Sequence, residues 1–201
     1  MSTAVVRQVA ARCLGYPDDD FFAALPSLRR ALPARHALHG FLDHAERIGP
    51  ADLAAHYVEV FDFRARRCLY LTWWTDGDTR RRGMAMVRFK EVYRSYGMDL
   101  TGEELPDFLP AVLEFTAATG DDGLLTDHRP AVELLRLSLA EHGTPYAAVL
   151  DAVCATLPGP SPKDRAAALA LARGGPPRED VGLEPYGHAP LPLVDTPGGR
   201  S

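Results

Sequence analysis

The spacing of apolar residues constrains the fold of this chain more than any other feature. Large apolar side chains recur at intervals of three and four residues, the spacing that places side chains on one face of an α-helix. Between residues 51 and 63 the stripe consists of Leu53, His56, Tyr57, Val60 and Phe61. Only residues 68–74 have strand-like composition, and no second strand candidate exists to pair with them. The pattern therefore predicts an all-α protein without a sheet.

Glycine and proline divide the chain into separate helices, and we expect a single-domain bundle of about eight to ten helices over residues 1–174. The expected helices cover 3–14, a segment from Asp18 that Pro26 kinks or splits, 34–48, 51–63, 79–96, 105–118, 127–142, a segment from Thr144 and a segment from Ser161 to Gly174. Residues 175–201 are rich in proline and glycine and carry too little apolar area to offset their ordering entropy. We expect this tail to be disordered, although residues 181–187 could dock on the body.

The bulk composition narrows the classes of function. With 201 residues the chain can bury one good core, and its net charge of -5 argues against a general role in binding nucleic acid. Three widely spaced cysteines argue against a disulfide framework and for a reducing compartment. The chain shows neither an export signal nor an apolar stretch long enough to span a membrane. These observations together predict a cytoplasmic protein that is not inserted in the membrane.

The stretch from Tyr70 to Gly83 does not follow the helical pattern. It contains both tryptophans, Trp73 and Trp74, followed by an Asp-Gly-Asp turn and three consecutive arginines. Cations at a helix N-terminus oppose the helix dipole, at a cost of a few tenths to about 1 kcal/mol each. We therefore expect another role for the motif residues, which are Asp76, Asp78, Arg80, Arg81 and Arg82. The arginines could pair with acids of the body or tail, or they could face phosphate, a nucleotide or a protein partner.

A second group of charges lies near the expected helix 105–118. This acidic stripe consists of Glu103, Glu104, Asp107 and Glu114. At about 100° per residue, Asp107 and Glu114 would lie one above the other, opposite the apolar face of the helix. The stripe could be an ordinary solvated face, which the pattern alone favours, or one wall of a groove for a basic peptide.

Signals for metal binding and catalysis are weak. His36, His39 and Asp43 fall on one expected helical face with His44 adjacent, but such a face supplies few fixed ligands and no second ligand motif joins it. A solvated helix face explains these residues better than a metal site. The chain has no phosphate-binding loop, nucleophile elbow or zinc-protease motif, and its serines offer no convincing nucleophile. We therefore expect that the protein is not an enzyme.

Two motifs are more specific than the helical pattern. Residues 57–62 and 68–83, the latter including Thr-Asp-Gly-Asp-Thr-Arg-Arg-Arg-Gly, resemble the NarJ-type nitrate reductase molybdenum cofactor assembly chaperones. The same holds for Glu-Leu-Pro-Asp-Phe-Leu-Pro at 104–110 and Leu-Glu-Phe at 113–115. The resemblance spans roughly residues 9–187 and extends to the wider family of redox-enzyme maturation proteins. It implies a TorD-like all-α fold.

The resemblance also implies a function. Members of this family act without catalysis, binding the basic N-terminal segment of the apo catalytic (alpha) subunit of their client in the cytoplasm. For this chain the implied client is respiratory nitrate reductase, and the implied role is to assist insertion of the molybdenum guanine dinucleotide cofactor and to delay membrane docking. The chaperone itself would bind no cofactor stably, although cofactor-delivery proteins could be partners. Two alternatives remain, a guanine-nucleotide-binding protein that uses Arg80–Arg82 and a generic all-α interaction protein.

The implied client segment is basic with an apolar flank and binds as a helix. Accordingly, the acids Glu104, Asp107 and Glu114 would meet its basic side chains. Three aromatic residues would take its apolar flank, namely Tyr57, Phe61 and Tyr70. The client, the peptide register and the oligomeric state stay open at this point.

Overall fold

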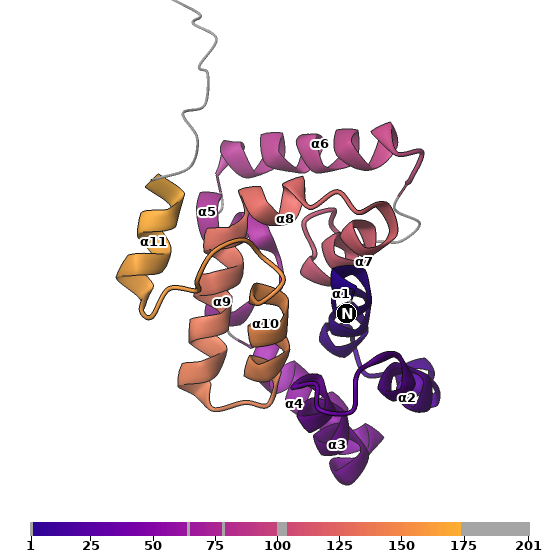
Figure 1. Cartoon of the computed structure of the whole chain (residues 1–201). Helices are drawn as coiled ribbons and strands as arrows, with labels where there is room; N and C mark the ends of the chain where they lie inside the picture. Colours follow the sequence, from indigo (N-terminus) through magenta and orange to yellow (C-terminus); the bar gives the residue numbers. More distant parts are fainter. Residues whose placement is uncertain (1, 64, 78, 100–103, 174–201) are drawn as a thin grey trace, which may run out of the picture.

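The computed structural model describes residues 2–63, 65–77, 79–99 and 104–173, and these residues form eleven α-helices and one 3₁₀ helix without a strand (Figure 1). The helices are α1 (Thr3–Leu14), α2 (Asp19–Ala31), α3 (Leu38–Ile48), α4 (Pro50–Phe61), η1 (Ala65–Arg67), α5 (Leu71–Asp76), α6 (Arg80–Ser95), α7 (Leu109–Thr119), α8 (Gly123–Asp127), α9 (Arg129–His142), α10 (Tyr146–Cys154) and α11 (Arg165–Arg173). The predicted all-α class is confirmed. The predicted tail, 175–201, lies outside the described residues.

Helices α1, α7, α9 and α10 form the centre of the bundle. α1 packs most extensively on α7 and also on α10, while α9 packs on α10 and α11. The small side chains of Ala10 and Ala11 are buried on α1, which lets its neighbours approach closely. α7 buries side chains around most of its circumference, as expected for a helix enclosed by others. This arrangement leaves one flank of α7 available to the solvent.

An aromatic cluster joins α3, α4 and α10. Tyr146 is fully buried, and its ring centroid lies 4.8 Å from those of both Phe41 and Phe61. The ring of Tyr57 lies 4.9 Å from that of Phe61, and its hydroxyl donates a hydrogen bond to the carbonyl oxygen of Leu14 at 3.3 Å. Because these rings fill the interior, the inward stripe predicted for residues 51–63 is confirmed at Tyr57 and Phe61.

Local capping explains several helix ends. The carboxylate of Asp18 accepts a hydrogen bond from the amide of Phe21 at 2.9 Å, so Asp18 caps α2 as the sequence predicts. Gly120 and Gly143 end α7 and α9 in the left-handed conformation that favours glycine. Of the two expectations for Pro26, a kink or a split, the split is wrong, since α2 continues through this proline. The carboxylate of Asp164 caps α11 by accepting a hydrogen bond from the amide of Ala167 at 2.8 Å.

Three other boundaries differ from the prediction. α3 begins at Leu38 instead of residue 34, and α7 begins at Leu109 instead of 105. α9 begins at Arg129 instead of residue 127, and the short helix α8 precedes it. Short helices lack the repeated apolar period that makes longer ones recognisable.

Helix α6 lies across one end of the bundle, above α7 and α8 in Figure 1. Only Phe89 and Tyr93 of this helix are buried. The Phe89 ring contacts His128 at a centroid distance of 4.8 Å, and the Tyr93 ring contacts Phe115 at 4.9 Å. None of the helices in the described parts of the chain combines the length and apolar character needed to cross a bilayer.

Candidate functional site

The two family motifs, far apart in sequence, form one structural unit. Tyr70 and Phe108 make an isolated antiparallel β-bridge, and their rings lie 5.5 Å apart. The amide of Leu71 donates to the carbonyl of Asp107 at 3.0 Å, and that of Leu109 donates to the carbonyl of Leu69 at 2.8 Å. The segment 69–72 is therefore held against the turn 105–109 that leads into α7.

Asp107 is the polar centre of this unit. Its carboxylate oxygen Oδ2 accepts hydrogen bonds from the amide of Thr72 at 3.0 Å and from the Thr72 hydroxyl at 2.5 Å. Both residues are fully buried. Because the first turn of a helix has unsatisfied amides and a partial positive charge, Asp107 stabilises the start of α5 from a distant part of the chain. We refer to Asp107 and Thr72, together with Arg82 described below, as the Asp107 node.

The position of Asp107 corrects the sequence-based prediction. Asp107 precedes α7, so it does not share an exposed helix face with Glu114. Its carboxylate is enclosed, and its second oxygen, Oδ1, has no hydrogen-bond partner among the described residues. In this conformation the Asp107 carboxylate is therefore not accessible for the predicted direct contact with a basic peptide. Pro110, in the first turn of α7, is the sequence signal that could have indicated the later helix start.

Glu104 and Tyr70 lie together at the surface of the unit. The Tyr70 hydroxyl donates to Oε2 of Glu104 at 3.1 Å. Glu104 is exposed, whereas Tyr70 is half-buried. Burial and then the charge of Glu104 raise the pKa of Tyr70 to about 12. The hydroxyl therefore stays protonated and serves as a hydrogen-bond donor at neutral pH.

The three consecutive arginines have different environments. The Arg82 Nε donates to the Thr72 hydroxyl at 3.3 Å, and its guanidinium lies 5.6 Å from the centroid of the Trp73 ring. Arg80 and Arg81 are exposed at the start of α6. Arg82 thus belongs to the fold of the turn, whereas Arg80 and Arg81 are accessible to a partner.

The remaining motif residues are partly structural. The indole N–H of Trp74 donates to the carbonyl of Cys68 at 3.1 Å, which satisfies a half-buried tryptophan. Part of this stretch, which does not follow the helical pattern in the sequence, forms the short helix α5. Asp76 is half-buried, and its carboxylate accepts a hydrogen bond from the Thr75 hydroxyl at 3.0 Å. Asp78 lies outside the described residues.

Two of the three aromatic residues predicted to contact a peptide are parts of the core. Tyr57 is 7% exposed and Phe61 is 5% exposed. Their rings pack on Tyr146, so in this conformation neither ring is exposed to the apolar flank of a peptide. Burial also raises the pKa of Tyr57. Of the predicted aromatic contacts, only Tyr70 reaches the surface.

Glu114 lies on a groove between the C-terminal half of α6 and the exposed flank of α7. The groove contains a cavity of about 210 Å³. Its lining is formed by Tyr93, Met98, Asp99, Ala111, Glu114, Phe115 and Ala118. Apolar groups thus share this groove with two carboxylates, Glu114 from α7 and Asp99 from the segment after α6. Glu114 was predicted from the sequence, but Asp99 was not, because no local pattern connects residue 99 with α7.

The candidate metal ligands do not converge. The His39 Nε2 lies 3.0 Å from the carbonyl oxygen of Pro33, and His36 precedes α3. Asp43 pairs with Arg29 at 2.6 Å, and Nδ1 of His44 lies 2.8 Å from Arg47. Within the described ranges, no group of three histidine, cysteine or acidic side chains is placed to hold a metal ion.

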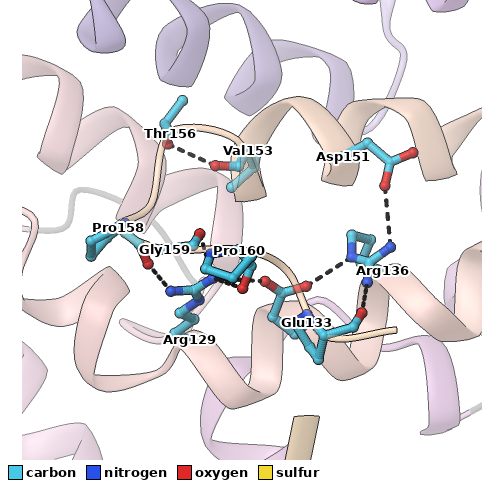
Figure 2. Close-up of polar contacts among 10 residues, drawn as sticks. Arg129, Glu133, Arg136, Asp151, Val153, Thr156, Pro158, Gly159 and Pro160 are labelled. Atoms are coloured by element: carbon cyan, nitrogen blue, oxygen red, sulfur yellow. Dashed lines mark hydrogen bonds and ion pairs between the residues drawn. The ribbon is translucent and has the colours of Figure 1, made fainter. Parts of the chain in front are cut away.

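A second buried carboxylate was not predicted. Glu133 of α9 is fully buried and forms ion pairs with Arg129 at 3.3 Å and Arg136 at 2.8 Å (Figure 2). Both arginines also donate to backbone carbonyls of the connection between α10 and α11, at Pro158, Gly159, Pro160 and Pro162. We call Arg129, Glu133 and Arg136 the Glu133 network. Its position inside the bundle indicates a structural role.

Comparison with known proteins shows the fold and the family. The fold matches the crystal structure of a protein described as a redox enzyme maturation protein from Archaeoglobus fulgidus, with a TM-score of 0.62, 20% identity and coverage of 76% of this chain and 92% of that one. The nitrate reductase-like protein NarX of Mycobacterium tuberculosis is 39% identical over 157 residues, which are 76% of this chain. The nitrate reductase molybdenum cofactor assembly chaperone NarJ of Escherichia coli K12 is 33% identical over 155 residues, which are 71% of this chain.

The matches cover only part of these relatives. The matched region is 24% of the length of the mycobacterial protein and 65% of the Escherichia coli protein. A family model described as nitrate reductase delta subunit matches residues 18–152, which include both motifs and the groove. The resemblance to NarJ-type chaperones is therefore confirmed, and the chain belongs to the nitrate reductase delta subunit family.

Proposed function

We propose that this protein is a cytoplasmic chaperone that binds the N-terminal segment of the apo catalytic subunit of respiratory nitrate reductase. In this role it assists insertion of the molybdenum guanine dinucleotide cofactor into the client and assembly of the enzyme. Family membership and the name of the Escherichia coli relative support the role. The chaperone binds its client without catalysis, and proteins that deliver the cofactor are further partners in the proposal.

The groove between α6 and α7 is the observation that carries this proposal. An amphipathic peptide helix binds by inserting apolar side chains into a groove, and its charged side chains then meet the rim. The groove offers an apolar surface at Ala111, Phe115 and Ala118, and an exposed carboxylate at Glu114. Its chemistry therefore suits a peptide with basic side chains beside apolar ones.

The buried residues of the site act indirectly in this proposal. Asp107 and Thr72 anchor the turn from which α7 starts, and α7 supplies Glu114. Tyr70 and Glu104 lie at the surface of the same unit and remain candidates for contact with the client. Asp107 is therefore a positioning residue, and Glu114 is a direct contact.

Isothermal titration calorimetry with a synthetic peptide of the client N-terminal segment tests the groove. Replacing Glu114 by lysine reverses the charge on the rim, and we expect affinity to fall about tenfold. The matched control is Glu141→Lys, which makes the same change at an exposed position on α9. Equal affinity of wild type and Glu114→Lys would reject the groove. The absence of the catalytic subunit from co-purified proteins would reject the chaperone role itself.

A further inference from the structure

A second carboxylate of the groove is already occupied by a guanidinium of the same chain. Asp99 lines the 210 Å³ cavity together with Glu114, and it also lines an adjoining cavity of about 120 Å³. The adjoining cavity is formed by Lys90, Tyr93, Arg94 and Asp99. Because Tyr93 and Asp99 line both, the two cavities adjoin each other at the C-terminal end of α6.

The geometry of the Arg94–Asp99 pair shows how a guanidinium fits this place. Arg94 Nε lies 3.5 Å from Oδ1 of Asp99. The two side chains are 66% and 81% exposed. Pairs between exposed side chains contribute little to folding stability, because water and salt screen them and their long side chains lose entropy. The pair can therefore open without loss of the fold, and Arg94 can be exchanged for another cation.

We propose that Asp99 is a second anionic contact for the bound segment and that Arg94 is its internal competitor. This inference rests on the proposed function, since its occupant is the basic N-terminal segment of the client. The segment would place one cationic side chain on Glu114, one apolar side chain in the cavity beside Phe115, and a second cationic side chain on Asp99 in place of Arg94. The chaperone thus selects segments that carry one cationic residue on each side of an apolar residue.

The competition has a measurable consequence. A client cation must displace Arg94 before it can bind Asp99, so the cost of opening the pair reduces the observed affinity. For an exposed pair this reduction is about twofold to fivefold. Removal of Arg94 should strengthen binding by that factor, and removal of the Asp99 charge should weaken it by a similar factor.

The experiment is a double-mutant cycle measured by calorimetry at low ionic strength, with the same synthetic peptide. Arg94→Gln is expected to bind about twofold to fivefold more tightly than wild type, and Asp99→Asn more weakly. In the Asp99→Asn background, Arg94→Gln should have no further effect. Arg165→Gln removes an equal charge from an exposed position on α11 and serves as the matched control. Circular dichroism verifies that each variant is folded.

The outcomes separate this inference from the proposed function. If wild type does not bind the peptide, the proposed function fails. If Glu114→Lys weakens binding while Arg94→Gln and Asp99→Asn leave it unchanged, the second contact fails and the groove stands. Weaker binding by Arg94→Gln would show that Arg94 contacts the peptide directly and would overturn its role as competitor.

Discussion

The Asp107 node and the Glu133 network each contain a fully buried carboxylate, but their charges are compensated differently. Both oxygens of Glu133 pair with arginines that also fix backbone carbonyls. Oδ2 of Asp107 accepts hydrogen bonds from two neutral groups, the amide and the hydroxyl of Thr72. Its Oδ1 has no hydrogen-bond partner among the described residues. Burial alone therefore does not distinguish the roles of two acids. Their partners show that Glu133 holds two arginines of its own helix, which bind the connection between α10 and α11, whereas Asp107 positions a turn at the edge of the groove.

The largest expected effect is in the Glu133 network. Glu133→Ala leaves Arg129 and Arg136 without their buried counter-charge, so the free energy of unfolding should fall by about 3 to 5 kcal/mol. Urea denaturation followed by circular dichroism measures the loss, and Glu141→Ala is the exposed control. A loss of less than about 1 kcal/mol would mean that the arginines find other partners, and the contrast with Asp107 would disappear.

A smaller loss is expected at the Asp107 node. Asp107→Ala removes the acceptor for the Thr72 amide and hydroxyl and should destabilise the protein by about 2 to 3 kcal/mol. Asp107→Asn keeps one accepting oxygen and should lose about 1 kcal/mol. The same denaturation experiment ranks the two variants. Equal losses would indicate that charge, and not hydrogen bonding, determines the contribution of Asp107.

The three consecutive arginines, Arg80, Arg81 and Arg82, are expected to contribute differently to stability. Arg82→Gln removes the hydrogen bond to Thr72 and the contact with Trp73, and we expect a loss of about 1 kcal/mol. The double variant Arg80→Gln/Arg81→Gln should change stability by less than about 0.5 kcal/mol, because both side chains are exposed. Thermal unfolding of the two proteins separates the roles. A larger loss in the double variant would assign the structural role to Arg80 or Arg81.

The smallest effect concerns pH and His128. Burial lowers the pKa of His128 below its usual value of 6.5, so the unfolded chain binds more protons than the folded one. The resulting stability is complete above the unfolded pKa and is lost as pH falls through it. The charge of Asp107 is a minor influence that raises the pKa of His128, whereas Glu133 has no such influence.

Asp107→Asn should therefore lower the pKa of His128 further and steepen the loss of stability in acid, while Glu133→Gln should leave this pKa unchanged. Proton NMR titration of the His128 ring, between about pH 7.5 and 5.5, measures the difference. An identical His128 titration in wild type and Asp107→Asn would remove the electrostatic link between this histidine and the node.

The long helices could be predicted because their information is local. The apolar period of residues 51–63, the Asp18 cap and the glycines that end α7 and α9 all act within a few residues. The helices α5 and α8 were missed because six and five residues are too few to establish a period. The pairing of Glu133 with arginines four residues before and three after is visible in the sequence. Its contact with the connection before α11 is not.

The candidate site could be predicted only in part. Glu114 was predicted to lie opposite the apolar face of its helix, and the structure places it on the groove. Tyr57 and Phe61 follow the inward period of their own helix, and this period was a better guide than the predicted peptide contact. Asp99 was missed because it lines the groove only after the chain has turned at the end of α6.

By itself, the sequence determined the all-α class, most helix positions and the family, because periodicity, caps and motif residues are properties of short segments. Only the tertiary structure decided which acids are exposed. Asp107 meets Thr72 across a sequence separation of 35 residues, and Asp99 meets α7 across the groove. Burial and charge pairing depend on such distant segments, so local patterns could not place Asp107 in the interior or bring Glu114 and Asp99 into one groove.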